Sequence, residues 1–516
     1  MELDRDLAMI QEVRDLVRAA NKAQKVLGAM SQEQIDRVVA AMCEAGARDA
    51  VRLAEMAVEE TGIGRVEDKV LKNLFATTYL YEHIKDMKTA GVVAHDRQNG
   101  VVEIAVPMGV VGAVSPTTNP TSTALNNAII AVKARNALVL SPHPRSKKCT
   151  REALETVRKA AVQAGAPEGC LGCISDPGIA ATEELMRNDG VSVIIATGGP
   201  GIVKAAYSSG KPAFGVGAGN APCYVERSAD IAAAAKLIVQ SKSFDNSTIC
   251  ASEQSVLCDS SVCAKVRSEL EKNGAYFMSD DERVSLEKIL LTPDNGMIAS
   301  SVGRSAETLA KMAGFSIPKG TLVLVGKIQG IGKGYPLSYE KLSPVLAFYE
   351  VKDWEEACSH AIHLLELGGL GHTMALHSTD ERIIMEFANR KPAMRILVNT
   401  LSSLGGVGGT TGLFPALTLG CGTGGGNIIS DNLGPQHLVN RKRLAYGQRD
   451  VEELKRRLLS GTNIAAAPSA SPVEKTAAVR EQEQQASSRN AADEQGMSEE
   501  ELVRRIVGEV FKKLER

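Results

Sequence analysis

The sequence carries almost no net charge, because its 59 Lys and Arg residues nearly balance its 61 Asp and Glu residues. A formal charge of −2 provides no general attraction to nucleic acid or to an anionic membrane surface. The sequence also lacks any apolar run long enough for a membrane-spanning helix. Its first segment, MELDRDLAMIQEVRDLVRAA, is acidic and amphipathic and has no apolar signal-peptide core. We therefore expect a cytoplasmic protein with no nucleic-acid partner and no membrane span.

Aromatic residues are scarce, at 4% of the chain, whereas glycine is abundant, with 47 residues. Abundant glycine, together with many Ala and Val residues, favours an α/β protein with tight turns near a ligand. The chain of 516 residues is longer than one compact core needs, and its hydrophobic content of 44% can fill large cores. We therefore expect two or three domains.

The ten cysteines do not form the pattern of a disulfide framework or of a zinc site. Several lie in apolar stretches, such as Cys43 in VVAAMCEAG, which favours reduced thiols packed in cores. Cys170 and Cys173 form a C-x-x-C pair, but a zinc site needs a second pair or suitably spaced histidines. We expect these two thiols to be structural, with a redox pair as the alternative.

Strand and helix patterns alternate along most of the chain, which predicts βαβ units and parallel sheets. Residues 3–60 predict two or three helices, a first α/β region follows them, and a second spans about 220–430. Ligands of parallel sheets bind at the carboxyl ends of the strands. In the first region these ends are SPTTNP, SPHPRS and the glycine turn ATGGPG, so we expect a ligand there.

The composition changes at about residue 461. Residues 461–497 are rich in Ala, Ser, Gln and Glu with almost no large apolar residue, which predicts a disordered linker. Ser498 and Glu501 then form a capping-box pattern, which indicates the start of a helix over 498–516. So short a helix is marginal alone in water, so we expect a partner, with docking on its own subunit as the alternative. Its apolar stripe comprises Leu502, Val503, Ile506, Val507, Val510, Phe511 and Leu514.

Cys250 lies among small and polar residues in the segment SFDNSTICASEQSV. This segment is one of seven that carry a resemblance to a known family. These segments are ETGIGRVEDKVLKN, SPTTNPT, SPHPRSKK, ATGGPGIVKAAYSSGKPAFGVGAGNAP, SFDNSTICASEQSV, EKLSPVLAFY and GLGHTMALHS. Together, in order over about residues 3–447, they resemble the aldehyde dehydrogenase superfamily and, more narrowly, its CoA-acylating branch. That branch includes the aldehyde dehydrogenase half of bifunctional aldehyde-alcohol dehydrogenases and the ethanolamine- and propanediol-utilisation enzymes of bacterial microcompartments.

The resemblance implies roles for three catalytic residues. Cys250 would attack an aldehyde carbonyl, and the Asn119 side chain with the Cys250 N–H would stabilise the alkoxide of the thiohemiacetal. Hydride transfer to NAD would leave a thioester on Cys250. His372 would accept the CoA thiol proton or lie near the CoA tail, with a structural histidine as an equal alternative. His143 and His377 are expected to be structural or to pack against the cofactor.

The resemblance also implies a cleft that binds NAD and then CoA, because the two share an ADP-like part. NADP stays open, because a ribose-binding lysine of hydrolytic relatives has no counterpart here. Glu340 in EKLSP matches the glutamate that holds the nicotinamide ribose. The other residues expected at the cofactor are Thr117, Ser141, Pro142, His143, Pro144, Gly198, Gly199, Pro200, Gly201 and Gly217.

One expected group is missing. Hydrolytic aldehyde dehydrogenases carry a general-base glutamate before the cysteine, but the matching segment FGVGAGNAP contains Gly215, Gly217 and Gly219 and no carboxylate. Water then attacks slowly, whereas a thiol attacks a thioester with less help. The sequence therefore predicts transfer of the acyl group to CoA. The resemblance implies propionaldehyde or acetaldehyde as the aldehyde that is oxidised. Hydrolysis to the free acid, with a base such as Glu253, is the alternative, and a non-catalytic scaffold is a remote one.

The family fold implies a Rossmann-type cofactor domain at 1–219, with a β-arm at about 90–108, and an α/β catalytic domain at 220–430. The chain would then return at 431–460 to the cofactor and oligomerisation region. The arm would combine its first part with 434–447 and support a homodimer or a dimer of dimers.

The tail resembles the encapsulation peptides of microcompartment enzymes, although in relatives this peptide is often N-terminal. We therefore expect residues 498–516 to bind a shell protein, with self-association between tails or a membrane-surface helix as the alternatives. The protein would act inside a microcompartment of the bacterial cytoplasm.

Overall fold

The structure is a computed structural model that describes residues 4–460. The chain forms two compact units, Met1–Tyr446 and Gly447–Arg516, which we describe separately. The expected linker at 461–497 and the expected helix at 498–516 lie outside the described residues.

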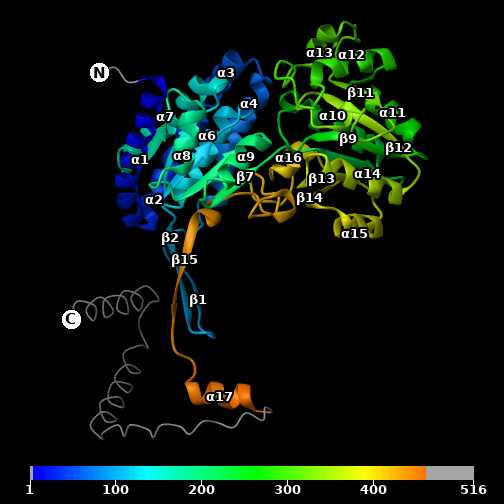
Figure 1. Cartoon of the computed structure of the whole chain (residues 1–516). Helices are drawn as coiled ribbons and strands as arrows, with labels where there is room; N and C mark the ends of the chain where they lie inside the picture. The colour runs from blue at the N-terminus through cyan, green and yellow to red at the C-terminus, as the bar shows by residue number, and fades with distance from the viewer. Residues whose placement is uncertain (1–3, 461–516) are drawn as a thin grey trace, which may run out of the picture. The chain divides into compact units, whose positions relative to one another are not determined.

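The first α/β part of the larger unit contains a five-stranded parallel sheet (Figure 1). In spatial order the strands are β5 (Leu171–Cys173), β4 (Ala137–Ser141), β3 (Val110–Val114), β6 (Val193–Thr197) and β7 (Ala213–Val216). β3 and β4 are buried throughout, as continuous apolar runs in parallel sheets usually are. The parallel sheet predicted from the alternating pattern is therefore confirmed.

Helices cover this sheet. They are α1 (Arg5–Ala29), α2 (Gln32–Arg48), α3 (Ala50–Thr61), α4 (Val66–Leu74), α5 (Leu80–Ile84), α6 (Pro120–Lys133), α7 (Lys147–Gln163), α8 (Ile179–Arg187) and α9 (Pro200–Tyr207). α1 and α8 pack together against the sheet, and α2, α6 and α7 form a second packed group. α6 is buried along its whole length and starts at Pro120, whose missing N–H costs nothing at that position. A π-helical turn, Phe75–Tyr79, joins α4 to α5.

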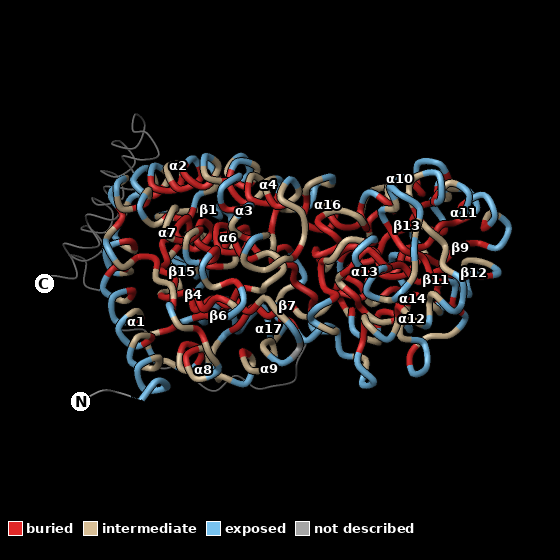
Figure 2. Tube along the Cα trace, turned by 90° about the horizontal axis from the view of Figure 1, so that it is seen from above, coloured by how far each residue is buried: buried red, intermediate tan, exposed pale blue. Residues whose placement is uncertain are grey.

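The second α/β part contains a seven-stranded parallel sheet. In spatial order its strands are β10 (Ala275–Phe277), β11 (Val323–Lys327), β12 (Val345–Val351), β9 (Glu253–Asp259), β8 (Ala221–Val225), β13 (Gly371–His377) and β14 (Ala393–Val398). Its helices are α10 (Ile231–Ser243), α11 (Cys263–Lys272), α12 (Asp280–Leu290), α13 (Ala306–Ala313), α14 (Trp354–Glu366), α15 (Glu381–Arg390) and α16 (Ser402–Gly406). Figure 2 shows that buried residues concentrate along the strands of both sheets.

A third, antiparallel sheet joins segments that are far apart in the sequence. β2 (Val101–Pro107) pairs with β1 (Gly91–Asp96) on one side and with β15 (Val439–Ala445) on the other. Glu103 of β2 forms ion pairs with Arg441 at 2.9 Å and Arg443 at 3.1 Å. These strands lie in the two segments from which the sequence predicts an arm.

The described part of the second unit contains one helix, α17 (Val451–Leu459), which sequence analysis did not predict. Asp450 caps it by accepting a hydrogen bond from the backbone N–H of Glu453 at 2.7 Å. Val451, Leu454 and Leu458 are exposed on this helix.

All ten cysteines are free. Burial raises the pKa of the Cys170 thiol to about 11 and that of Cys173 to about 12, which suits inert thiols. Among residues 4–460, no cluster of His, Cys, Asp and Glu side chains could hold a metal ion. Over the same residues, every helix is too short or too polar to cross a bilayer.

Candidate active site

Cys250 ends a strained loop between α10 and β9, residues 244–250, which we call the thiol loop. Three successive residues of this loop, Asp245, Asn246 and Ser247, have positive φ angles of 46°, 51° and 65°. Non-glycine residues rarely adopt this conformation, and it persists only where surrounding contacts hold it. The thiol loop therefore depends on contacts from other elements.

The side chain of Asp245 makes such contacts with α4 and the turn before it. Its Oδ2 accepts from Lys72 Nζ and from Lys69 Nζ at 3.0 Å, and its Oδ1 accepts from the Arg65 N–H at 2.7 Å. Burial raises the pKa of Asp245, but the charges of Lys72 and Lys69 outweigh it and hold the pKa below its ordinary value. The segment ETGIGRVEDKVLKN therefore holds the thiol loop in place through its contacts with Asp245.

His372, in β13, contacts the thiol. Its Nε2 lies 3.2 Å from Cys250 Sγ, and its Nδ1 lies 2.9 Å from Thr373 Oγ1. Thr373 Oγ1 also accepts from Nε of Arg395, at 3.3 Å. A proton on Nδ1, donated to Thr373, leaves the Nε2 lone pair free to accept the thiol proton.

The protonation of this pair follows from burial. Burial raises the pKa of the Cys250 thiol to about 12; Glu340 and Cys421 act in the same direction, while Arg395 opposes them. Burial, assisted by the charge of Arg395, lowers the pKa of His372 to about 3. Both groups are therefore neutral at pH 7, and the thiol must lose its proton to a base as it reacts.

Asn119 is the N-cap residue of α6 and lies beside the thiol loop. Its Oδ1 accepts from Lys72 Nζ at 2.6 Å, and its Nδ2 donates to the carbonyl oxygen of Thr248 at 3.2 Å. Among the described residues, no hydrogen bond joins Asn119 to Cys250 itself, so the amide reaches the thiol loop two residues before the thiol.

The segment that lacks a carboxylate packs directly on the thiol loop. An added Cβ at Gly219 would lie 2.2 Å from the carbonyl oxygen of Cys250, so only glycine fits there. An added Cβ at Gly217 would have no neighbour within 4 Å. At Gly215 it would lie 2.8 Å from Val203 Cγ1. Close approach to the Cys250 backbone thus explains one of the three glycines.

Two buried carboxylates lie near this segment. Glu340 Oε1 accepts from the Gly219 N–H at 2.9 Å, and burial raises the pKa of Glu340 to about 7. Glu253 Oε1 accepts from the Ser402 N–H at 3.0 Å, and burial raises the pKa of Glu253 to about 7 as well. No hydrogen bond among the described residues joins either carboxylate to Cys250.

A cavity of about 700 Å³ lies at the carboxyl ends of β3, β4 and β6, and we call it the strand-end cavity. An added Cβ at Gly199 or Gly201 would have no neighbour within 4 Å, so the turn before α9 leaves space for a ligand. Thr117 is half-buried and does not line this cavity, and Pro200 is the first residue of α9. The predicted cofactor residues that line the cavity are Ser141, Pro142, His143, Pro144, Gly198, Gly199 and Gly201.

A second cavity, of about 550 Å³, contains the other two predicted cofactor residues, Gly217 and Glu340. We call it the glycine cavity, because five glycines besides Gly217 line it: Gly296, Gly368, Gly424, Gly425 and Gly426. His377 lies elsewhere, buried at the end of β13 with no hydrogen bond to Nε2.

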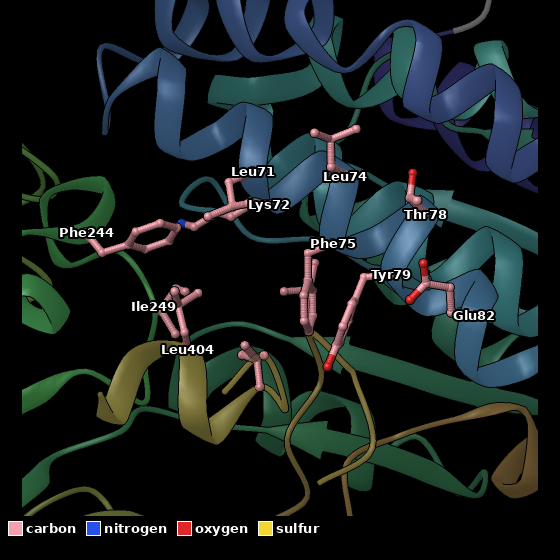
Figure 3. A pocket seen from close by; sticks show the side chains of 13 residues that line it. Leu71, Lys72, Leu74, Phe75, Thr78, Tyr79, Glu82, Phe244, Ile249 and Leu404 are labelled. Atoms are coloured by element: carbon pink, nitrogen blue, oxygen red, sulfur yellow. The ribbon is translucent and has the colours of Figure 1, made fainter. Parts of the chain in front are cut away.

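A third cavity, of about 300 Å³, borders the thiol loop, and we call it the apolar cavity. Figure 3 shows Phe244 and Ile249 of the thiol loop on one side and Thr78, Tyr79 and Glu82 on the other. The rest of its lining is largely apolar: Leu71, Leu74, Phe75, Leu404, Val407 and Leu417, with Lys72 and Gly409.

The sequence of residues 6–283, more than half of the chain, matches the aldehyde dehydrogenase family. The chain belongs to this family. It is 44% identical to the bifunctional aldehyde-alcohol dehydrogenase AdhE of Escherichia coli (strain K12), over 84% of this chain and 49% of that protein. It thus spans about half the length of this curated relative.

Solved structures of aldehyde dehydrogenases share the fold. An acetylating aldehyde dehydrogenase from Geobacillus thermoglucosidasius is 52% identical, with a TM-score of 0.86, over 87% of this chain and 99% of that chain. A propionaldehyde dehydrogenase from the fucose utilisation microcompartment of Clostridium phytofermentans is 28% identical, with a TM-score of 0.77, over 84% of this chain and 97% of that chain. The predicted resemblance to aldehyde dehydrogenases is confirmed.

Sequence analysis missed three residues of this candidate site: Lys72, Asp245 and Arg395. Lys69 and Lys72 are spaced three apart in a quoted motif, but lysines on a helix usually face solvent. Arg395 interrupts the strand pattern AMRILV and is 3% exposed, so a lone charge in an apolar strand was the available signal.

Proposed function

We propose that the protein oxidises an aldehyde to an acyl-CoA, with Cys250 as the nucleophile and NAD as the hydride acceptor. One observation carries the proposal. The Cys250 thiol lies 3.2 Å from His372, which is neutral at pH 7. The neighbouring segment FGVGAGNAP contains no carboxylate that could activate water.

In the first step, His372 Nε2 accepts the thiol proton as Cys250 Sγ attacks the carbonyl carbon. Asn119 Nδ2 and the Cys250 N–H donate to the alkoxide that forms. Loss of hydride from the thiohemiacetal leaves a thioester on Cys250. NAD, when bound, supplies the acceptor for that hydride. His372, with a pKa of about 3, releases its proton to solvent and regains its lone pair.

The nucleotide fits the two larger cavities. The strand-end cavity would hold its adenosine and pyrophosphate, with Pro142 and the turn at Gly198–Gly201 as contacts. The glycine cavity would hold the nicotinamide ribose at Glu340. CoA would use the strand-end cavity after the nucleotide leaves, because both carry an ADP-like part. NADP would bind in the same way, so the preference between the two is a matter for measurement.

Thiol transfer then completes the turnover. The CoA thiol attacks the thioester carbonyl, His372 Nε2 accepts the thiol proton, and Cys250 leaves as the reprotonated thiol. A thiol needs less activation than water, and no carboxylate is hydrogen-bonded to the reacting groups among the described residues. This supports transfer to CoA.

Hydrolysis to the free acid is the second candidate, and one observation favours it. Glu340 lines the glycine cavity with a pKa raised by burial to about 7, which suits a general base near neutral pH. Its hydrogen bond to the Gly219 N–H at 2.9 Å counts against this, because it holds one carboxylate oxygen on the backbone.

The substrate we propose is propionaldehyde or acetaldehyde. The largely apolar lining of the apolar cavity supports an uncharged aliphatic chain.

We further propose a homodimer or dimer of dimers built on the β1-β2-β15 sheet, with the cofactor domain at 1–219 and the catalytic domain at 220–430. The tail at 498–516 would bind a shell protein of a bacterial microcompartment. The likeness to the microcompartment enzyme of Clostridium phytofermentans supports this location. Fusion of residues 497–516 to a fluorescent reporter tests it: a reporter that stays diffuse in shell-producing cells would contradict the proposal.

The deciding experiment measures NADH formation from propionaldehyde, with and without CoA, in wild type and in Cys250→Ala. We expect NADH formation that depends on CoA, yields propionyl-CoA and is lost in the variant. Equal rates without CoA, with propionate as the product, would support hydrolysis. NADH formation by Cys250→Ala would exclude the proposed nucleophile.

A further inference from the structure

Lys72 is a buried cation whose partners all lie at the thiol loop or directly before α6. Its Nζ donates to Asn119 Oδ1 at 2.6 Å, to Thr248 Oγ1 at 2.8 Å and to Asp245 Oδ2. Its side chain is 3% exposed. An ammonium group has three protons and no lone pair, so every partner of the charged amine must be an acceptor.

This requirement decides which way the amide of Asn119 faces. The two ends of an amide have nearly the same shape but opposite hydrogen-bonding character, and only Oδ1 can face an ammonium group. Nδ2 is therefore turned toward the thiol loop, where it donates to the carbonyl oxygen of Thr248 at 3.2 Å, and it also donates to Thr118 Oγ1 at 3.1 Å. The reversed amide would set its N–H groups against those of the buried Lys72 ammonium group.

We propose that Lys72 is a positioning residue that keeps Nδ2 of Asn119 directed at the alkoxide formed on Cys250. This inference rests on the proposed function, in which Asn119 donates to that alkoxide. Without the ammonium group, only the two acceptors of Nδ2, Thr118 Oγ1 and the Thr248 carbonyl oxygen, oppose a turned amide that presents Oδ1 to the developing negative charge. The transition state then meets a lone pair where it needs a proton.

Lys69 supplies a matched control. It lies one helical turn before Lys72, is equally buried with 3% exposure, and also donates to Asp245 Oδ2, at 3.0 Å. Its other partner is the carbonyl oxygen of Thr118 at 2.9 Å, not the Asn119 side chain. Loss of either lysine removes one buried charge from Asp245, but only loss of Lys72 frees the amide.

The test is a double-mutant cycle on kcat for NADH formation from propionaldehyde in the presence of CoA. It compares Lys72→Met, Asn119→Ala and the double variant, with a parallel cycle for Lys69→Met. We expect Lys72→Met alone to lower kcat by about 100-fold, with little change in KM for the aldehyde, as for loss of an oxyanion donor. In the Asn119→Ala background the same change should cost less than about 5-fold, because coupled residues are not additive. Lys69→Met should cost the same factor in both backgrounds.

An equal cost of Lys72→Met with and without Asn119 would overturn the inference, because Lys72 would then act only through Asp245 and the thiol loop. Wild-type kcat in Asn119→Ala would overturn the proposed role of Asn119 as well. Failure of the proposed function is recognised separately, in the wild-type enzyme, as turnover without CoA. If Lys72→Met does not fold, Lys72→Arg keeps the charge beside Asp245 but moves the donor, and its coupling to Asn119→Ala provides the same test.

Discussion

Two buried clusters of lysines and carboxylates flank Cys250, and they differ in whether their charged side chains pair directly. In the first, Lys69 and Lys72 form direct ion pairs with Asp245, whose pKa stays below its ordinary value. The second cluster consists of Lys242, Lys341, Glu253 and Glu340, all buried.

The second cluster is held by neutral groups. Lys341 Nζ donates to three backbone carbonyl oxygens and Lys242 Nζ to Gln254 Oε1, and among the described residues no ion pair joins the four charged side chains. Burial lowers the pKa of Lys242 to about 7 and raises the pKa values of Glu253 and Glu340 to about 7. Direct pairing thus holds the pKa of Asp245 below its ordinary value, although burial still lowers the pKa of Lys72 to about 8. In the second cluster, burial without direct pairing gives Lys242, Glu253 and Glu340 pKa values of about 7.

The comparison predicts its largest effect at Asp245. Asp245→Ala leaves two buried ammonium groups without a counter-ion, so it should lower the free energy of unfolding by about 3–5 kcal/mol. Urea unfolding followed by circular dichroism measures this. Asp49→Ala, at a partly exposed ion pair, is the control and should cost under about 1 kcal/mol. Equal losses of unfolding free energy in the two variants would show that the ion pairs of Asp245 with Lys69 and Lys72 do not stabilise the fold.

The next effect concerns the glycine that connects the second cluster to the thiol loop. Gly219→Ala places a Cβ 2.2 Å from the Cys250 carbonyl oxygen and should shift the thiol, with a loss of about 100-fold in kcat/KM for the aldehyde. Gly412→Ala adds the same methyl group where no atom lies within 4 Å and outside the lining of the three cavities, so it should change kcat/KM for the aldehyde by less than about 3-fold. Steady-state kinetics of both variants would contradict the close-packing argument if the losses were similar.

A pH-dependent effect should follow from Glu253. The pKa of Glu253 is about 7 in the folded protein and near its ordinary value of 4.5 in the unfolded protein. Between pH 4.5 and pH 7 the carboxyl group is therefore protonated in the folded state but ionised in the unfolded state. Folding stability from this group therefore falls as pH rises from about 4.5 to about 7. Glu253→Gln should remove that fall and be more stable than wild type by about 3 kcal/mol at pH 8. Urea unfolding at pH 5 and pH 8 measures the difference in unfolding free energy between Glu253→Gln and wild type. The same difference at both pH values would show that Glu253 does not titrate as described.

The smallest effect concerns the thiol itself. Glu340 raises the pKa of Cys250, so Glu340→Gln should lower that pKa by less than about one unit while the amide oxygen still accepts from Gly219. The rate of Cys250 alkylation by iodoacetamide against pH, followed by peptide mass spectrometry, reports the shift. Cys421→Ala removes another group that raises this pKa and should act in the same direction. An unchanged or raised pKa in Glu340→Gln would show that the carboxylate does not influence the thiol.

The parallel sheets and the strand-end cavity could be predicted from the sequence, because both depend on local patterns. Apolar runs such as VVGAV and ALVLS predict buried strands, and the residues just after parallel strands meet at one edge of the sheet. Ser141, His143 and Gly198 accordingly line one cavity. The proximity of Cys250 and His372 could not be predicted from spacing, since 122 residues separate them.

The sequence by itself determined the order of strands and helices, the cysteine in its polar segment and the absence of a carboxylate among Gly215, Gly217 and Gly219. These properties depend only on residue identity and on patterns between residues that are close in the sequence. Only the tertiary structure decided that Lys69 and Lys72 turn inward to Asp245, that Gly219 abuts the Cys250 backbone, and that burial shifts the pKa values of Cys250 and His372 apart. The physical reason is that burial and pairing depend on which distant segments pack together, and a charge responds to its surroundings rather than to its neighbours in the chain.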